Sequence, residues 1–477
     1  MREDWTECCF EDILDYEQPT KYIVNSTDYN DAYEMPVLTA GKSFIKGYTN
    51  ETEGIFENLP TIIFDDFTTA SQYVDFKFKV KSSAMKILVP TSKLVNMRFA
   101  FYCMQVNQIR NDTHKRYWIS VYAKKKFLLP SLVEQKAIIS KIEELFSDLD
   151  KGIDDLKKAK DQLVIYRQAV LKKAFEGELT KKWREKQTNL PTADELLKQI
   201  KGDFEKLVKE NNKKKEKPLL PIKNDDIPHL IPKTWNWCNL GDVSWFINGD
   251  RGKNYPNRNE YVSSGIPWIN TGHIEPDGSL SSDKMNFITR EKFNTLRSGK
   301  IQPGDLVYCL RGATFGKTAY VVPYTEGSIA SSLMIIRSNE KLNNTYLYHF
   351  LTSVEGKKQL QRFDNGTAQP NLSANMVRSY AFPLPSTVEQ HQIVREIESR
   401  LSVCDKVEQS INDSLEKAKA LRQSILRKAF EGTLLSATEI ARCKLEKDYE
   451  PAAKLLAKIK AERKIKSKLN LNNGSRT

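Results

Sequence analysis

"PSLVEQKAIISKIEELF", residues 130–146, returns as "PSTVEQHQIVREIESRL" at residues 385–401. The two copies end in "YRQAVLKKAFEGEL" and "LRQSILRKAFEGTL", so Pro130–Leu179 and Pro385–Leu434 align without a gap at an offset of 255 residues. An ungapped match of this length is far outside chance, and its period is too long for a solenoid. The repeat therefore indicates that one large unit has been duplicated.

Each copy is predicted to form one long helix. Apolar or small residues recur at alternating spacings of four and three, which is typical of a coiled-coil seam. The predicted seam of the first copy is Ile138, Ile142, Leu145, Leu149, Gly152, Leu156, Ala159, Leu163, Tyr166 and Val170. That of the second copy is Ile393, Ile397, Cys404, Val407, Ile411, Ala418, Leu421 and Ile425, with Arg400 and Ser414 as polar exceptions.

The ends of both helices carry start and stop signals. Pro130 and Pro385 suit the first turn, and the following serines suit an N-cap with a capping-box glutamate three residues on. Gly177 and Gly432 suit the C-terminal stops. About 45 residues at ~1.5 Å each give rods of roughly 65 Å. Rods of equal length and register are expected to pack against each other.

A shorter helix is expected after each rod. "PTADELLKQIK" (Pro191–Lys201) and "EPAAKLLAKIKAER" (Glu450–Arg463) place matching leucine pairs after the two repeats. Residues 211–233, "NNKKKEKPLLPIKNDDIPHLIPK", are rich in Lys and Pro and are interpreted as an extended linker.

The segments before the rods are predicted to be globular. Each begins with Trp, Cys and a β-rich run, and each later holds a strand–turn–strand stretch, Thr61–Phe76 and Asp305–Val322. Short alternating strands broken by Gly and Pro, with a helix near "NNTYLYHFLTSVEGKKQL", favour an α+β class with much antiparallel sheet. The predicted architecture is two globular α/β domains joined by two long antiparallel coiled-coil helices, a pseudo-twofold internal repeat. Its segments are 1–127, 128–180 (helix), 181–233 (short helix and linker), 234–382, 383–435 (helix) and 436–477 (basic helix).

Composition excludes several classes of protein. The chain has 477 residues, no run of about 18 apolar residues and no apolar segment after its acidic start, so we expect neither a membrane span nor a secretory signal. Seven scattered cysteines without a CxxC pair are interpreted as reduced thiols of a cytoplasmic protein. The net charge is +13, of which residues 441–477 hold +7. This charge permits DNA binding without establishing it.

Catalytic motifs are missing. "RGATFGKT" (Arg311–Thr318) has three rather than four residues between its glycines and lacks the first P-loop Gly, so we interpret it as a β-turn whose Arg311, Thr314 and Lys317 project towards a ligand. No Asn-Pro-Pro-aromatic tetrapeptide and no Gly-rich cofactor loop occur, and the five histidines lack metal spacing. Catalysis and metal binding within this chain are therefore not expected.

Loops in both globular segments are dense in side chains that contact phosphates and base edges. They lie in "FDDFTTASQY", "RNDTHKRYW", "NGDRGKNYPNR", "RGATFGKT" and "RFDNGTAQPNLSANM". The predicted DNA-binding residues are Thr68, Thr69, Ser71, Gln72, Tyr73, His114, Lys115, Arg116, Tyr117, Arg251, Lys253, Asn254, Arg311, Thr314, Lys317, Asn365, Thr367, Gln369 and Asn371.

The chain resembles the specificity (S) subunit of a type I restriction–modification system. The "PSxVEQ…AFEGxL" blocks, "DDFTTASQYV", "LRGATFGKTAY" and "PLLPIKNDDIPHLIPKTWNW" are the most specific parts of this resemblance, which extends over nearly the whole chain. It implies that 1–127 and 234–382 are target-recognition domains, each reading half of a split, asymmetric sequence in double-stranded DNA. The helices would hold the domains apart and fix the unread spacer.

The resemblance also implies partners. A non-catalytic S subunit recruits two methyltransferase (M) subunits and, through them, two restriction (R) subunits, so S-adenosylmethionine, ATP and Mg²⁺ are expected in the partners and no cofactor in this chain. The expected location is the cytoplasm of a bacterium or archaeon. Three alternatives stay open: an S-like subunit of a related defence system, a stand-alone DNA-modifying enzyme with unrecognised motifs, and a coiled-coil adaptor that binds only protein.

Overall fold

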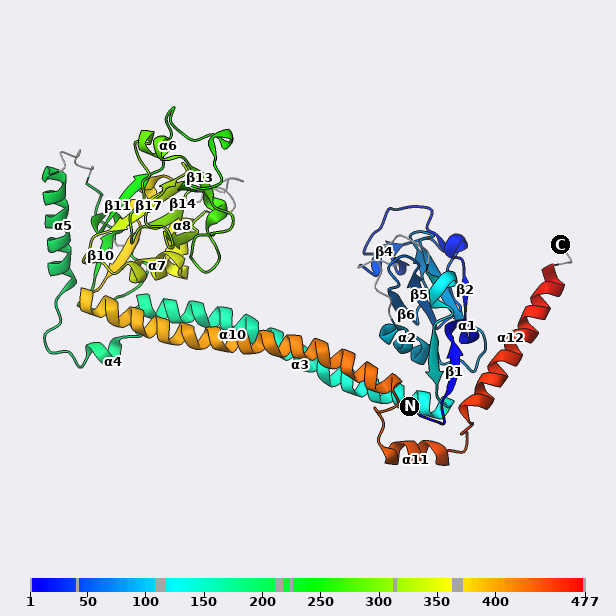
Figure 1. Cartoon of the computed structure of the whole chain (residues 1–477). Coiled ribbons are helices and arrows are strands. Elements are labelled where there is room, and N and C mark those ends of the chain that lie inside the picture. The colour runs from blue at the N-terminus through cyan, green and yellow to red at the C-terminus, as the bar shows by residue number, and fades with distance from the viewer. Residues whose placement is uncertain are drawn as a thin grey trace. The chain divides into compact units, whose positions relative to one another are not determined.

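The structure is a computed structural model that describes residues 2–39, 43–107, 117–210, 218–223, 226–311, 315–362 and 372–474. It divides into two compact units (Figure 1). The first unit joins Met1–Lys157 to Asn412–Thr477, and the second is Lys158–Ile411. The long helices α3 (Leu132–Phe175) and α10 (Thr387–Phe430) each contribute one part to each unit.

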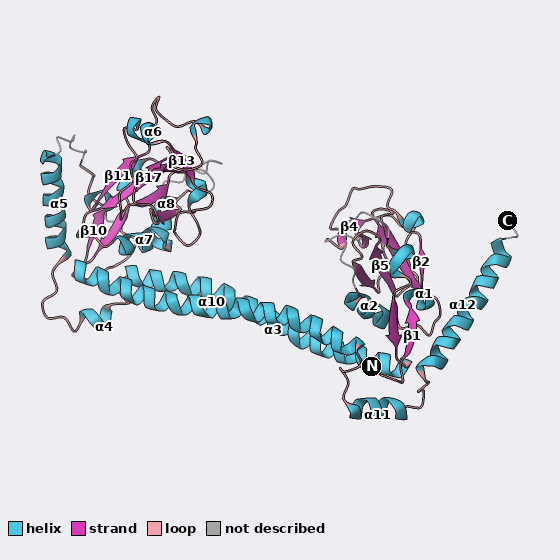
Figure 2. Cartoon of the chain, in the orientation of Figure 1, coloured by secondary structure: helices cyan, strands magenta, loops and turns pink. Residues whose placement is uncertain are grey.

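The first unit holds three small sheets (Figure 2). Its four-stranded sheet has the order β2-β8-β5-β6, its three-stranded sheet β4-β3-β7, and its two-stranded ribbon β1-β9. Their bounds are β1 Thr6–Cys9, β2 Leu14–Glu17, β3 Met35–Leu38, β4 Ile45–Thr49, β5 Thr61–Asp65, β6 Ser71–Val74, β7 Lys79–Val80, β8 Met85–Pro90 and β9 Lys126–Leu129. The unit's other helices are α1 (Phe10–Ile13), α2 (Met97–Val106), a π-turn (Trp118–Tyr122), α11 (Ala437–Leu445) and α12 (Ala452–Gly474).

The second unit repeats this plan. Its sheets have the orders β11-β17-β14-β15, β13-β12-β16 and β10-β18. Their bounds are β10 Asn236–Asn239, β11 Ser244–Asn248, β12 Ile266–Ile269, β13 Asn286–Ile288, β14 Leu306–Cys309, β15 Thr318–Tyr320, β16 Ser328–Ile329, β17 Leu333–Ser338 and β18 Ala381–Leu384. Its other helices are α4 (Lys181–Arg184), α5 (Ala193–Glu210), α6 (Arg290–Thr295), α7 (Asn344–Thr352), α8 (Val354–Gln361) and α9 (Ala374–Arg378).

The strand orders of the two units correspond one to one. Every named pairing is antiparallel except β3 with β7 and β12 with β16, which occupy the same place in the two units. The sequence-based expectations of an α+β class, mainly antiparallel sheet and an internal duplication are therefore confirmed. The helix expected near residue 350 consists of two helices, α7 and α8, which meet at the Ser353 cap.

Both long helices begin and end with the same devices. The backbone N–H groups of Glu134 and Glu389 donate to the Oγ atoms of Ser131 and Ser386, as the capping-box interpretation predicts. The prolines precede the caps instead of occupying the first turn, since α3 begins at Leu132. Gly177 and Gly432 have φ values of 77° and 76°, the left-handed region that a helix stop requires.

The packing of α3 and α10 differs from a regular two-position seam. One of the two predicted seam positions of α10 is buried along the helix. Its residues, spaced by seven, are Ile397, Cys404, Ile411, Ala418 and Ile425. The other predicted position is wrong at Val407 and Leu421, which are 42% and 51% exposed, and on α3 at Tyr166, which is 47% exposed. The covered stripe is therefore narrower than the seam of a regular two-stranded coiled coil, in which both positions face the partner helix.

Charged side chains join the two helices within each unit. In the second unit, the Arg167 guanidinium lies 2.8 Å from the Asp405 carboxylate and 3.0 Å from that of Glu408. In the first unit, Arg422 pairs with Asp150. A higher residue number on α3 is therefore paired with a lower residue number on α10, which confirms the antiparallel arrangement of the two helices.

The short helices complete the two cores. Leu196 and Ile200 of α5 lie in the main core of the second unit, and Leu455 and Ile459 of α12 lie in that of the first. The start of the basic C-terminal segment is therefore packed on the first domain. In the described part of the chain, no helix combines the length and apolarity needed to cross a membrane.

Candidate nucleic-acid interface

Two adjacent aspartates shape the predicted DNA-binding loop of the first domain. Asp65 Oδ1 accepts hydrogen bonds from the backbone N–H groups of Phe67 (2.9 Å) and Thr68 (3.2 Å). Asp66 Oδ1 accepts from the N–H groups of Tyr117 (3.1 Å) and Trp118 (2.8 Å). The turn between β5 and β6 is thus tied to the chain that enters the π-turn.

The predicted contact residues of this loop fall into two groups, buried side chains that hold the loop and exposed side chains. Thr69 is 1% exposed with φ 59°, and the Ser71 hydroxyl accepts a 2.9 Å bond from Gln105 Nε2. With the buried Tyr117, these predicted contact residues hold the loop and do not face solvent. Thr68 and Gln72 are exposed, so DNA contact by these two stays a prediction.

Tyr73 has an intermediate position. Its ring is half-buried, packs 6.0 Å from that of Phe101 and lies under the Arg98 guanidinium at 4.8 Å. Arg98 also pairs with Glu143 and, more weakly, with Asp75. His114, Lys115 and Arg116 lie outside the described residues.

The loop after β11 in the second domain is fixed by Asp250. This carboxylate is 7% exposed and accepts from the N–H groups of Gly252 (2.9 Å) and Arg297 (2.8 Å). The bond from Arg297, followed by that from Gly252, lowers the pKa of Asp250 below its usual value. Asn254 Nδ2 donates to the Thr295 carbonyl at 2.8 Å, so this predicted contact residue supports the loop. Arg251 and Lys253 are exposed on it.

The described end of "RGATFGKT", residues 315–318, forms a turn that leads into β15. Gly316 has φ 81°, and a Cβ there would approach Leu360 Cδ1 to 2.5 Å, so only glycine lets the turn lie this close to α8. Arg311 and Lys317 are exposed at the two sides of the turn. Thr314, Asn365, Thr367, Gln369 and Asn371 lie outside the described residues.

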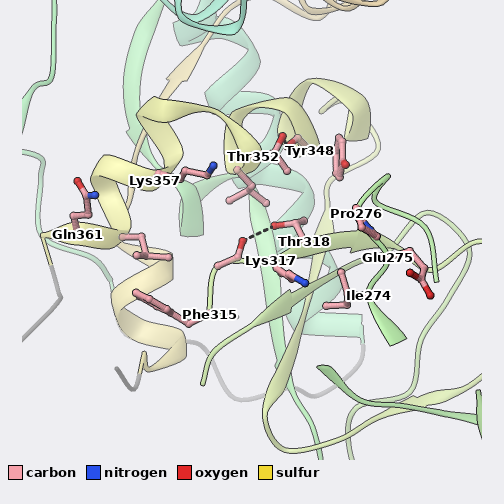
Figure 3. Close-up of a pocket in the computed structure, with 13 residues that line it drawn as sticks. Ile274, Glu275, Pro276, Phe315, Lys317, Thr318, Tyr348, Thr352, Lys357 and Gln361 are labelled. Carbon is pink, nitrogen blue, oxygen red and sulfur yellow. Dashed lines mark hydrogen bonds between the residues drawn. The ribbon is translucent and has the colours of Figure 1, made fainter. Parts of the chain in front are cut away.

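A cavity of about 560 Å³ opens beside this turn (Figure 3). Lys317 reaches it from the turn and Lys357 from α8, with Gln361, Thr352 and Tyr348 on the helical side. Neither lysine has a carboxylate partner among the described residues, whereas the cavity's Glu275 lies 3.5 Å from Lys284. The site therefore presents two free cations with hydroxyl and amide groups, which suits a phosphate.

The sequence-based selection omitted two cations that the structure places beside the predicted ones. Lys357 lies on a helix whose charged residues resemble an ordinary solvated face, and sequence gives no sign that α8 packs beside the turn. Arg258 stands in the quoted loop "NGDRGKNYPNR" and forms a short 3₁₀ turn with Glu260. The high density of basic residues in this loop is the sequence feature that could have led to the selection of Arg258.

The described residues contain no group of three His, Cys, Asp or Glu side chains arranged to hold a metal ion. The described candidate loops expose polar Thr68 and Gln72 in the first domain and basic Arg251, Lys253 and Lys317 in the second. At the level of class, the chain therefore holds two duplicated α+β domains with polar surface loops.

Comparison with known proteins identifies the family. Residues 2–160 and 232–417 match the type I restriction modification DNA specificity domain, so the match occurs twice and includes most of the chain. The chain belongs to this family. The specificity role is non-catalytic, and the prediction of a DNA-specificity chain that is not an enzyme is confirmed.

Individual relatives agree with this family assignment. The chain is 29% identical over 425 residues to the type I restriction enzyme EcoR124I/EcoR124II specificity subunit of Escherichia coli, an alignment that includes 86% of this chain and 89% of the relative. A chain solved to explain complex assembly and conformational transition of the type I R-M system superposes with a TM-score of 0.62 at 15% identity, over 91% of this chain and 99% of that one. The HsdS subunit from Thermoanaerobacter tengcongensis superposes with 0.51 at 16% identity, over 91% and 98%. These two likenesses concern the fold.

Proposed function

We propose that this chain reads a bipartite, asymmetric sequence in double-stranded DNA, one half-site for each globular domain. The duplicated plan is the observation that supports the proposal most directly, because two domains with matching strand orders carry different loops. Different loops on a common scaffold read different half-sites, and two linked modules multiply specificity.

The proposed assembly contains two M subunits and two R subunits. In it, the M subunits use S-adenosylmethionine to methylate adenine, and the R subunits use ATP and Mg²⁺. The missing methyltransferase and P-loop motifs in the sequence support this division of labour. Such an assembly acts on DNA in the cytoplasm of a bacterium or archaeon.

Lys317 and Lys357 are proposed to hold a backbone phosphate in the cavity beside α8. Both are exposed cations without a carboxylate partner among the described residues, and phosphate contacts position a domain without reading sequence. Loss of both should weaken binding to all sequences alike.

The experiment uses the full chain assembled with its methyltransferase partner. The methylome of cells that express both should contain one bipartite motif with a gap of constant width, and the purified complex should bind that motif in preference to random duplexes. Absence of any such motif, or equal binding to all duplexes, contradicts the proposed function. The chain alone should transfer no methyl group.

The phosphate site is tested through salt dependence. K317A/K357A should reduce the slope of log K against log [salt] by about 1, the value for one lost phosphate contact, with an unchanged motif. K182A/K198A is the matched control, because both lysines are exposed in the same unit away from the cavity. An unchanged slope in K317A/K357A rejects this placement of the phosphate.

A further inference from the structure

A second cavity, of about 540 Å³, lies over the β13-β12-β16 sheet of the second domain. Trp268 and Ala330 form its buried floor, and Tyr255 and Tyr261 are half-buried in its wall. The rings of Tyr255 and Trp268 meet edge to face, with centroids 5.3 Å apart. Because Trp268 has almost no exposed surface, the half-buried rings of Tyr255 and Tyr261 are the apolar surfaces on which another ring could stack.

Polar groups surround this aromatic floor. Arg258 is exposed, and Asn286 and Ser332 are partly exposed on the cavity wall. Among the described residues, no ion pair is found for Arg258, and no hydrogen bond for the side chains of Asn286 and Ser332. An unpaired guanidinium, amide and hydroxyl are the groups that recognise base edges.

The corresponding part of the sheet in the first domain carries different side chains. Strand registers make Val37 the counterpart of Trp268, because each residue begins the parallel pairing of its strand, with Lys79 and Ser328 respectively. Gly47 opposes Val37 where Asn286 opposes Trp268. The scaffold is shared, but the aromatic floor and the amide belong to the second domain alone.

In the first domain, a side chain of the protein covers this position. A Cβ on Gly47 would meet Tyr29 Cβ at 2.6 Å and Tyr29 Cγ at 2.8 Å, so Tyr29 is seated directly on the glycine. At the corresponding place, the second domain has the cavity with Asn286 on its wall. A ring from the same chain therefore covers one site, and the other has room for a ring from outside.

Predicted DNA-contact residues stand close in sequence to residues that line the cavity. Arg251 and Lys253 precede the lining residue Tyr255 in the same loop. The N–H of Leu310, the residue before Arg311, donates to the carbonyl of the lining residue Ser332 at 2.9 Å. The exposed guanidinium of Arg258 on the cavity wall favours a ligand whose ring is attached to a phosphate backbone.

We propose that this cavity holds one nucleobase, unstacked from the DNA half-site that the second domain reads, and that Asn286 and Arg258 select its identity. The inference rests on the proposed function and adds a specificity determinant to it. The base stacks against the tyrosine wall of the cavity, Tyr255 and Tyr261, and its edge meets the amide of Asn286 and the guanidinium of Arg258.

The test begins with the full complex on its own bipartite target. Fluorescent base analogues replace each position of the second half-site in turn, and unstacking raises their emission. We expect a several-fold rise at the methylated adenine, which the methyltransferase must extrude, and a second rise at a position that is not methylated. If only methylated positions brighten, the inference is wrong while the proposed function stands. If no target binds at all, the proposed function itself fails.

Variants assign the second signal to this cavity. N286A and R258A should each lower that signal and reduce discrimination at the same base pair by roughly 5- to 100-fold, with the other positions read as before. N294A and R290A on α6 are the matched controls, because neither residue lines the cavity. A second signal that persists unchanged in both N286A and R258A overturns the assignment.

Discussion

Two buried glutamates, Glu134 and Glu389, hold equivalent positions with different partners. Glu389 accepts hydrogen bonds from Thr180 Oγ1 (2.7 Å), Trp235 Nε1 (2.8 Å) and the Arg184 guanidinium. Glu134 accepts from Arg2 at 2.6 Å and from Ser131 Oγ at 3.1 Å. In each unit, one carboxylate thus joins a long-helix cap to segments distant in sequence.

Removal of the Glu389 carboxylate should be costly. E389A leaves Arg184 without its buried counter-ion and Trp235 Nε1 without an acceptor, so we expect a loss of about 3–5 kcal/mol of unfolding free energy. Chemical denaturation of the full chain measures it. E398A, at an exposed position on the same helix, should stay within about 0.5 kcal/mol of the parent. Equal stability of the two variants would contradict this role.

His349 should make stability depend on pH. Its Nε2 is buried without a hydrogen-bond partner among the described residues, and desolvation lowers its pKa from 6.5 to about 4. The unfolded chain therefore binds a proton between these values while the folded chain does not. The stability contribution is complete above pH 6.5 and is lost as pH falls towards 4.

The corresponding variant is H349F. Between pH 7 and pH 4, the parent should lose up to about 3 kcal/mol more unfolding free energy than H349F. Denaturation curves of both chains at several pH values measure the difference, in which the carboxylates common to both chains cancel. Parallel pH profiles would show that His349 does not titrate as its burial implies.

Residue-level prediction from sequence succeeded for caps and failed for exposure. Ser131, Ser386, Gly177 and Gly432 act through local backbone geometry, which a short motif determines. The burial of Ser71 and Tyr117 depends on Gln105 and Asp66, whose contacts join segments more than 30 residues apart. Composition of a loop cannot distinguish its supporting hydroxyls from its exposed ones.

At the scale of elements, periodicity predicted the long helices but not their contact width. Both helices run 44 residues, close to the expected 45. Val407 and Leu421 have the right spacing for a seam and are nevertheless exposed. Sequence periodicity gives the apolar face and is silent on how much of it is covered.

Two glycines associated with α3 should respond oppositely to alanine. Gly152 lies within the helix with open space around its Cβ direction, so G152A should add up to about 1 kcal/mol through helix propensity. Gly177 has φ 77°, and a Cβ there would meet Pro232 Cγ at 2.4 Å, so G177A should cost more than about 1 kcal/mol. Thermal unfolding of the two variants compares them directly, and a shift of the same sign in both would contradict the assignment.

At the scale of the whole molecule, the duplication extends to the short helices, because α12 packs into the core of the first domain as α5 packs into the core of the second. The repeated blocks predicted a short helix after each long one, but not the core that each short helix joins. The two cavities were not predictable, because each brings together segments separated by loops of differing length.

The length of the long helices should set the spacing between half-sites. Under the proposed function, seven residues inserted at matching points of both α3 and α10 keep the heptad register and add about 10 Å to each helix. At about 3.4 Å per base pair, the methylation motif should gain roughly three base pairs in its gap. The two half-sites should keep their sequences, since no recognition loop has changed. Methylome sequencing reads gap and half-sites together, and an altered half-site would show that the helices do more than space the domains.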